Sequence, residues 1–440
     1  MSEPHPIDLV CAIVFATLIV LICRTWLDIQ PAIAQARRHT ITWKPKTPLD
    51  CPLCRSAQPP RPALLHEVQP WRLGRNRRGA KKRYDSEGFA CPNPDCLYFG
   101  CTIASIHALV SDGFRGKAEP IHRWKCQACG RSVSERWHTP MYYLKTSSFR
   151  VSEVMTALAE GVDESAAQRI FHHDRHTIAR WLKRCGSHAQ RLHDLFFRRL
   201  RCAHLQLDEL VTTIRGGLER VWIWAVIPQG GCALDAQTKI VPVIHVGRRT
   251  VLDAHVFVHQ LKLRLLPDHV PAFSSDGLRS YFSALTAHYG FWRDPDPGKR
   301  KPIWIVDPRL LFGQLHKVRC GRKLKTLYTR IRCGSRRRWR HALQVLGFSG
   351  QVQTAFIKRL NLTLRELVAP LSRRTWSLAR NEMSLTRHLH WVLIYYHFVR
   401  PHQSLRLCGR HNRLLTPAMA AKLTPHRWTV CEVLRYPVLE

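Results

Sequence analysis

The sequence is short of acidic residues. Its 440 residues include 31 Asp and Glu against 69 Lys and Arg, which gives a formal net charge of +38. Basic residues run along the whole chain, so a polyanion is the expected partner, because each neutralised phosphate releases counterions. Nucleic acid is therefore favoured over a membrane surface, and a hydrophobic content of 45% excludes a disordered chain.

The sequence also lacks an apolar run of clear membrane-spanning length. Residues 9–23 are apolar throughout, but they fall short of the roughly 20 residues that a spanning helix needs. A cleaved secretory signal is not expected, because the preceding MSEPHPID lacks a positively charged segment. A membrane anchor and a buried or self-associating helix both remain open. We expect a cytoplasmic, DNA-associated protein, with residues 9–23 as the alternative membrane tether.

Four of the 16 cysteines form two closely spaced pairs, Cys91 with Cys96 and Cys126 with Cys129. Tetrahedral zinc needs four ligands, and short loops between cysteines present two thiolates at a time. Gly130 follows the second pair, where a tight turn needs a positive φ. The pattern predicts structural zinc in a zinc ribbon rather than a disulfide framework.

Upstream of these pairs, residues 36–90 are rich in Pro, Arg and Lys and predict a basic linker. Within it, Cys51 and Cys54 have the spacing of metal ligands but no obvious partner pair. They are a candidate second or alternative zinc pair.

Apolar residues at helical spacing from Val151 onward indicate three short helices, the third over residues 175–184. The residues expected on the inward side of the third helix are Ile178, Trp181 and Leu182. The residues expected on its outward side are Arg175, His176, Arg180 and Lys183. Three helices with a basic last one predict a helix-turn-helix whose third helix enters the major groove of DNA. A plain helical linker is the alternative.

Two apolar stretches each lead to an aspartate. Leu205 and Leu207 lie in an expected strand that ends at Asp208, and residues 270–273 lead to Asp276. A carboxylate at the end of an apolar strand lies at the rim of a sheet, where a cation can neutralise it. Further strands are expected at 220–227, 239–246 and 302–307, and helices at 251–266 and 278–289. A mixed α/β sheet with an acidic metal site is predicted, although each aspartate alone could simply cap the following element.

A strongly basic segment follows between residues 309 and 340 and includes Arg322 and Lys323. We interpret this segment as facing DNA. A long helix is expected to begin near Gln351.

The order of these features resembles that of the DDE transposases of bacterial insertion sequences, in the group that carries a zinc ribbon and a helix-turn-helix. The resemblance covers roughly residues 50–425, and its motifs are LDEL, SSDG, FIKRLNLTLR and YYHFVRPHQSLR. It implies an RNase H-like catalytic domain in which two Asp and one Glu hold two Mg²⁺ or Mn²⁺ ions. Those ions would activate water, and then a 3′ hydroxyl, for attack on a phosphodiester of double-stranded DNA.

Residue by residue, the resemblance makes Asp208 and Asp276 the first two acids. The third carboxylate of such proteins comes one position before R-x-N-L-T-L-R, and that position here is Lys358. We expect Phe356 and Leu360 to face the sheet, which would bring the Lys358 ammonium within salt-bridge range of at least one aspartate. It would then compete with a divalent cation. The fold and DNA binding should survive this change, and strand cleavage should be impaired.

Two functions of different classes follow. The first is a transposase that binds element ends and carries out metal-dependent cleavage and strand transfer. The second is a non-catalytic zinc-ribbon and helix-turn-helix DNA-binding protein that is derived from a transposase. We also expect homo-oligomers.

The fold class is predicted to be α/β, with an RNase H-like mixed sheet behind a zinc ribbon and a helix-turn-helix. The length predicts several domains. The expected domains are an apolar helix (1–35), the linker (36–90), the zinc ribbon (91–147), the helix-turn-helix (148–200), the catalytic domain (201–370) and a helical C-terminal extension (371–440).

Overall fold

The structure is a computed structural model of the whole chain. It describes residues 69–71, 84–117, 119–228, 238–294, 302–321, 323–347, 351–352, 354–373, 375–405 and 414–438. Residues 9–23, most of the expected linker, and Cys51 and Cys54 lie outside the described residues. In the part of the chain that is described, helices are too short or too polar to cross a membrane.

The chain divides into two compact units. The first unit takes in residues up to 109 together with 126–131, and the second takes in 110–125 and 132–439. Three short strands, β1 (Leu109–Arg115), β2 (Ile121–Cys126) and β3 (Ser132–Ser134), pair in that order. Alternate residues of β2 point inward, so His122 and Trp124 are buried and their rings meet edge to face at 4.2 Å.

Three helices follow: α3 (Ser148–Ala159), α4 (Glu164–Phe171) and α5 (Arg175–Phe196). Each begins where a side chain can accept hydrogen bonds from free backbone N–H groups, and the capping residues are Ser147, Asp163 and Asp174. The third helix is 22 residues long. The sequence analysis expected it to end near residue 184, but it continues to Phe196. Its inward stripe continues through Ala189 and Leu192, which are fully buried.

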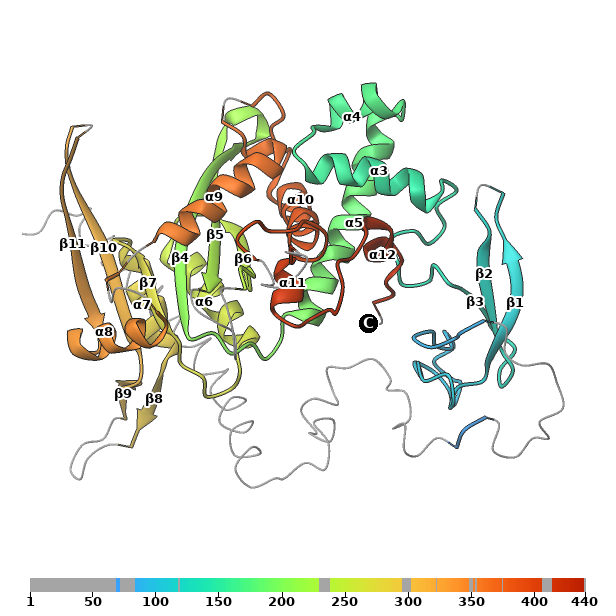
Figure 1. The fold of residues 1–440 in the computed structure, drawn as a ribbon, viewed down its shortest axis with the longest axis horizontal. Coiled ribbons are helices and arrows are strands. Elements are labelled where there is room, and N and C mark those ends of the chain that lie inside the picture. Colours follow the sequence, from blue (N-terminus) through green and yellow to red (C-terminus); the bar gives the residue numbers. More distant parts are fainter. Residues whose placement is uncertain are drawn as a thin grey trace, which may run out of the picture. The chain divides into compact units, whose positions relative to one another are not determined.

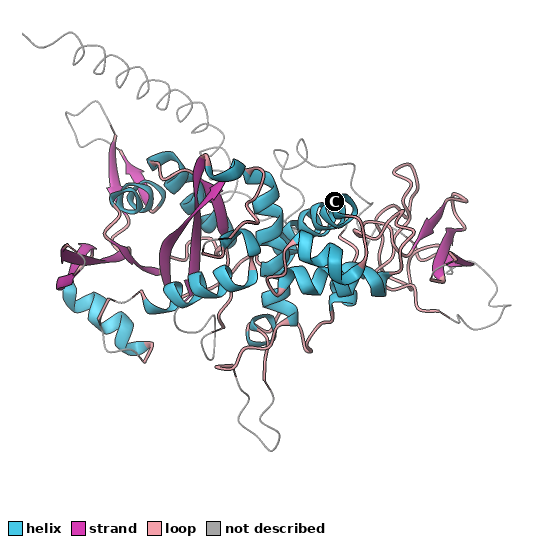
Figure 2. Cartoon of the chain, turned by 90° about the horizontal axis from the view of Figure 1, so that it is seen from above, coloured by secondary structure: helices cyan, strands magenta, loops and turns pink. Residues whose placement is uncertain are grey.

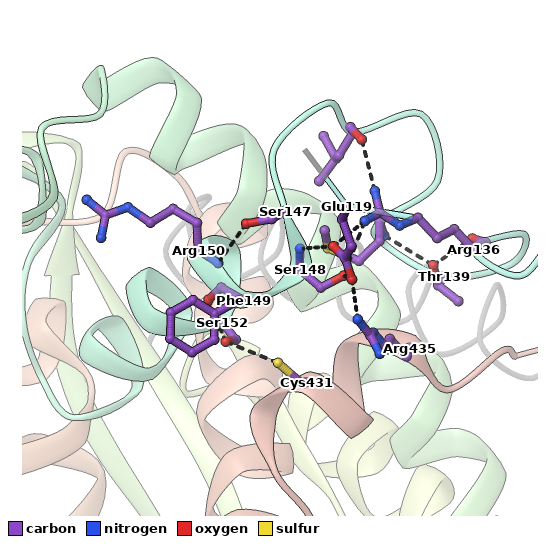
Figure 3. A network of polar contacts seen from close by, with 12 residues as sticks. Glu119, Arg136, Thr139, Ser147, Ser148, Phe149, Arg150, Ser152, Cys431 and Arg435 are labelled. Carbon is purple, nitrogen blue, oxygen red and sulfur yellow. Dashed lines mark hydrogen bonds and ion pairs between the residues drawn. The ribbon is translucent and has the colours of Figure 1, made fainter. Parts of the chain in front are cut away.

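A network of polar contacts fixes the start of α3 (Figure 3). Glu119 accepts hydrogen bonds from the backbone N–H and the hydroxyl of Ser148 at 2.6 and 3.1 Å, and it forms an ion pair with Arg136 at 2.5 Å. Arg435 forms a further ion pair with the same carboxylate. Although burial opposes the charge, these hydrogen bonds and cations lower the pKa of Glu119. One acid therefore connects the β1–β2 turn, the start of α3 and the C-terminal end of the chain.

A six-stranded sheet forms the centre of the second unit. Its strands are β4 (His204–Ile214), β5 (Glu219–Pro228), β6 (Ile244–Gly247), β7 (Ala272–Asp276), β10 (Leu311–Cys320) and β11 (Lys323–Cys333). The spatial order is β11-β10-β7-β4-β5-β6. Strands β4, β7 and β10 run parallel to one another, whereas β5, β6 and β11 pair antiparallel to their neighbours. This confirms the expected mixed α/β sheet.

Helices lie on both sides of this sheet (Figure 2). They are α6 (Val251–Arg264), α7 (Arg279–His288), α8 (Arg336–Val345) and α9 (Ala355–Leu367). Helix α9 crosses β4 and β5 (Figure 1), and its Ile357 N–H donates to the Gln206 side chain at 3.1 Å. Gln206 and Asp208 share a face of β4, because alternate residues do. The next residue, Glu209, accepts a hydrogen bond from the Tyr281 hydroxyl of α7 at 3.1 Å.

The sheet also corrects some expected elements. Strand β4 does not end at Asp208 but continues to Ile214, because β5 pairs with it beyond the aspartate. Strand β6 is shorter than the expected 239–246, and the expected strand at 302–307 is β9 (Ile303–Val306), which pairs with β8 (Gly290–Arg293) in a separate two-stranded sheet. The basic segment contains β10, a strand of the main sheet that was not foreseen, because its cations obscure its alternation.

The C-terminal helices belong to the same hydrophobic core as the sheet. The short helix η2 (Ala369–Leu371) leads toward α10 (Glu382–Ile394), which continues as the π-helical η3 (Tyr395–Val399), followed by α11 (Pro417–Ala420) and α12 (Val430–Arg435). Helix α10 packs along α5 (Figure 1), so closely that a Cβ on Gly186 would lie 2.7 Å from the backbone carbonyl carbon of Arg387. One core cluster extends from Met141 to Val438.

Candidate functional site

The four paired cysteines converge in the first unit. The Sγ atoms of Cys91 and Cys129 lie 3.5 Å apart, and those of Cys96 and Cys126 lie 3.8 Å apart. All four sulfur atoms lie within 4.8 Å of one another. Tetrahedral Zn–S bonds of about 2.3 Å place neighbouring sulfurs about 3.8 Å apart. The predicted convergence is confirmed, and the group could hold a metal such as zinc.

Hydrogen bonding within this group prepares one thiol for deprotonation. A hydrogen bond with Cys91 is the main cause that lowers the pKa of Cys126 to about 5, and burial raises the pKa of Cys96 to about 11. The backbone N–H groups of Ala128 and Cys129 also stabilise the Cys126 thiolate. Metal ligation requires thiolates, so a cation would find the first of them already favoured.

The two predicted aspartates lie side by side on the central parallel strands. Leu207 of β4 pairs with Ser275 of β7, so Asp208 and Asp276 follow at the same level of the sheet. Their carboxylate oxygens lie within 4.8 Å of each other. Asp276 also accepts a hydrogen bond from the Leu278 N–H at 3.0 Å, so it caps the turn into α7 as well.

Burial and crowding weaken the negative charge of this acidic pair. Burial, followed by repulsion from Asp276, raises the pKa of Asp208 to about 6. Lys358 and Lys317 act in the opposite direction through their positive charges. A carboxyl group with this pKa is mostly ionised at pH 7 and can still serve as a ligand for a cation.

Glu209 is a third acid at this position that the sequence analysis missed. Its carboxylate belongs to the same group of ligand atoms within 4.8 Å. Arg249 donates two hydrogen bonds to its Oε1, at 3.0 and 2.6 Å, and the Tyr281 hydroxyl donates to its Oε2. Burial and repulsion from Asp276 raise the pKa of Glu209 to about 7. It follows Asp208 directly, and consecutive residues of a strand normally point to opposite faces, so the sequence spacing does not indicate a shared site.

Lys358 lies beside the acids, but the expected salt bridge is wrong. Asp208 and Asp276 both favour its charged form, whereas burial and then Lys317 lower its pKa. Within the described residues, no carboxylate oxygen lies within 4.0 Å of the Lys358 ammonium nitrogen, which is the limit for an ion pair. The helix is turned slightly from the expected orientation, because Ile357 rather than Phe356 is fully buried. Lys358 is therefore at the border of the inward stripe, next to another ammonium.

The nearest side chain of α9 to the acids is one that the sequence analysis also missed. Asn361 donates a hydrogen bond from Nδ2 to Oδ2 of Asp208 at 3.1 Å. It lies three residues after Lys358 and therefore on the same side of the helix. Asn361 is the first residue of the NLTLR motif, and this position in the motif was the only sequence feature that could have pointed to it.

The outward residues of α5 are placed as predicted. Arg175, His176, Arg180 and Lys183 are all exposed, whereas Ile178, Trp181 and Leu182 are buried. Arg175 forms an ion pair with Glu164 of α4 at 3.6 Å. The remaining cations leave a basic stripe on the first half of the helix.

A second basic surface is the hairpin of β10 and β11. Lys323 is exposed at the start of β11, whereas Arg322 lies outside the described residues. No Asp or Glu occurs in the sequence between Asp307 and Glu366, so acids of this segment cannot offset its cations. Such a surface favours a polyanion.

Neither a family model nor a curated protein matches the chain. The resemblance to DDE transposases therefore remains a prediction that rests on the motifs.

Proposed function

We propose that this chain is a DNA-binding protein of the DDE transposase type, with an RNase H-like domain built on the six-stranded sheet. The observation that carries the proposal is the position of Asp208 and Asp276 on neighbouring parallel strands. The order β6-β5-β4-β7-β10, antiparallel over the first three strands and parallel over the last three, supports the same assignment. An α/β sheet commonly carries its site at the ends of such strands.

The donor set fits a weakly held divalent cation. Two carboxylates and a neighbouring amide are oxygen groups of the kind that Mg²⁺ and Mn²⁺ prefer. When bound, such a cation would stabilise the charge on a phosphodiester and activate the attacking hydroxyl. Asp208 and Asp276 would hold it, and the Asn361 side chain would keep Asp208 oriented. The Lys358 ammonium opposes it.

Double-stranded DNA is the proposed partner, bound as element ends and target. The α5 residues Arg175, His176, Arg180 and Lys183 would contact it in a helix-turn-helix arrangement. Lys323, with Arg322, would contact the phosphate backbone from the hairpin. A zinc ion on the four cysteines would form a zinc ribbon, because the sulfur spacing matches a tetrahedral site.

A second candidate function is DNA binding without cleavage, and Lys358 is the observation that favours it. The ammonium supplies a positive charge where the resemblance implies a third carboxylate. The negative charge that the side chains offer to two cations is therefore smaller. Strand cleavage then requires the chain to hold its cations with fewer acids.

The test uses the full-length protein and three variants. DNA affinity is measured by fluorescence anisotropy over a range of salt, and nicking is measured on supercoiled plasmid with Mg²⁺ or Mn²⁺. Lys358→Glu should bind DNA and nick it, and Asp208→Asn in the same background should bind without nicking. Arg359→Glu, an equal charge change on the exposed side of α9, is the matched control and should not nick.

Each outcome decides between the candidates. Nicking by the native protein as strong as that of Lys358→Glu would show that Lys358 is no obstacle. Binding without nicking by Lys358→Glu would favour the non-catalytic function. Loss of salt-dependent DNA binding in every form would overturn the proposal as a whole.

A further inference from the structure

We propose that Asn361 is a protein ligand of the divalent-cation site, and that its amide oxygen partly replaces the carboxylate missing at position 358. The inference rests on the proposed function, because it needs Asp208 and Asp276 to hold a cation. It adds a ligand that neither the composition nor the spacing of acids in the sequence indicates.

The first observation is an unsatisfied polar atom. Asn361 is only 8% exposed, and its Oδ1 is buried with no hydrogen-bond partner among the described residues. An unpaired buried polar group destabilises the folded state, because it has lost its hydrogen bonds to water. A native fold that retains such an atom beside two carboxylates needs an explanation.

The second observation is where the amide lies. Its Nδ2 donates to Asp208 at 3.1 Å, so the side chain is directed at the acidic pair. An asparagine amide oxygen is a hard, neutral ligand of the kind that Mg²⁺, Mn²⁺ and Ca²⁺ accept. A cation held by Asp208 would therefore be within reach of Oδ1, and it would give this atom the partner that it lacks.

Glu209 is a weaker candidate for the third ligand. Both of its carboxylate oxygens already accept hydrogen bonds, from Arg249 and from the Tyr281 hydroxyl. These three hydrogen bonds leave its carboxylate about one free lone pair, on Oε2, and the two from the Arg249 guanidinium are charge-assisted. A cation at Glu209 would therefore compete with existing partners. Coordination by Asn361 breaks no hydrogen bond at Oδ1.

Lys358 can leave without breaking an ion pair. Its ammonium is not within 4.0 Å of an acid in the described structure, and Lys317 repels it. Displacing it toward solvent therefore costs less than opening a buried salt bridge would. The site can then accept a cation, but with the affinity of two carboxylates and one neutral oxygen.

The experiment measures Mn²⁺ binding by isothermal titration calorimetry, in full-length protein that carries Lys358→Ala. This background removes the competing ammonium and leaves the proposed three ligands. Adding Asn361→Leu should weaken Mn²⁺ binding by at least about tenfold. Adding Leu362→Ala, on the exposed side of α9, is the matched control and should leave it unchanged. Urea unfolding and DNA affinity of each variant establish that it is folded.

A further substitution separates a ligand from a residue that only positions Asp208. Asn361→Asp offers a carboxylate oxygen but can no longer donate to Asp208 when ionised. If Asn361 is a ligand, this variant should bind Mn²⁺ more tightly than Lys358→Ala alone. Equal or weaker binding would reduce Asn361 to a positioning residue and would overturn the inference.

The remaining outcomes are also distinguishable. Unchanged binding in Asn361→Leu, or a loss on Glu209→Gln instead, would overturn the assignment of Asn361. If Asp208→Asn leaves Mn²⁺ binding unchanged, the acidic pair is not the metal site, and the proposed function fails with it. If Lys358→Ala binds no Mn²⁺ but still binds DNA, Asn361 does not complete the site, and DNA binding without cleavage remains.

Discussion

The cysteine group and the acidic pair are both candidate metal sites, but they are built in different ways. The cysteine group has four equivalent ligands, and its sulfur atoms lie at about the spacing that zinc needs. The acidic pair takes its groups from β4, β7 and α9, and one of the positions that faces it holds a lysine. The first site has a full set of donors, whereas the second has donors and an opposing charge.

The two sites differ in what a single substitution removes. In the cysteine group, any one substitution removes a quarter of the ligands. At the acidic pair, the sheet, α9 and both aspartates are in position although residue 358 is a lysine. A site of this second kind can lose its chemistry while the fold that carried it is retained.

The largest expected effect is loss of the metal from the cysteine group. Cys126→Ser should reduce bound zinc from about one ion per chain to almost none, because a structural zinc site needs all four of its protein ligands. Metal content is measured by mass spectrometry of the purified protein. Cys320→Ser, at an exposed position of the β10–β11 hairpin, is the control and should keep its zinc. Equal zinc in both variants would contradict the assignment.

Acid should destabilise the second unit through its buried histidines. Burial lowers the pKa of His188, His388 and His390 to about 4, and that of His397 to about 3. Above pH 6.5 these groups are neutral in both states and contribute nothing. Below it the unfolded chain binds protons first, so each group costs up to about 1.4 kcal/mol per pH unit.

The urea midpoint at pH 7.5 and at pH 5.5 measures this loss. Glu209 and Asp208 act in the opposite direction, since their raised pKa values make the folded state bind protons first as the pH falls through about 7 and about 6. These two groups offset only part of the loss from four histidines. A midpoint that does not fall at pH 5.5 would mean that the histidines are already charged in the fold. Replacing the exposed His176 by Asn is the control and should leave the pH dependence unchanged.

Lys358→Met sharpens the comparison by removing the opposing charge without adding a ligand. We expect Mn²⁺ affinity to rise by about tenfold, or about 1.4 kcal/mol, because a nearby positive charge is lost. The gain should be smaller than that from Lys358→Glu, which also supplies a carboxylate. Calorimetry with Arg359→Met as the control checks this expectation. No gain from Lys358→Met would show that the missing ligand, rather than the ammonium, limits the site.

The smallest expected effect separates DNA binding from both metal sites. Arg180→Ala should weaken DNA binding several-fold and lower the slope of log affinity against log salt by about one. Zinc content and Mn²⁺ affinity should not change, since Arg180 lies on the exposed side of α5. An unchanged salt slope would remove α5 from the proposed DNA surface.

Local spacing in the sequence was enough to predict some features. The two cysteine pairs are closed by short loops, so their convergence needed only the chain between them. The inward and outward residues of the first half of α5 follow from helical periodicity. The apolar runs that lead to Asp208 and Asp276 identified both strands, because alternation is a property of consecutive residues. The expected end was right for β7 and wrong for β4, which continues to Ile214 because β5 pairs with it up to that residue.

Other features were decided only by the tertiary structure. Helix α5 extends to Phe196 because α10, from the C-terminal part of the chain, covers its second half. Strand β10 forms in a segment whose charges hide its pattern, because β7 and β11 supply its hydrogen bonds. Asn361 meets Asp208 across 153 positions of sequence, and Lys358 lies beside Lys317 rather than in a salt bridge. Local sequence determines what each element is, but the chemistry of the acidic site depends on which side chains the packing of α9 brings to the sheet.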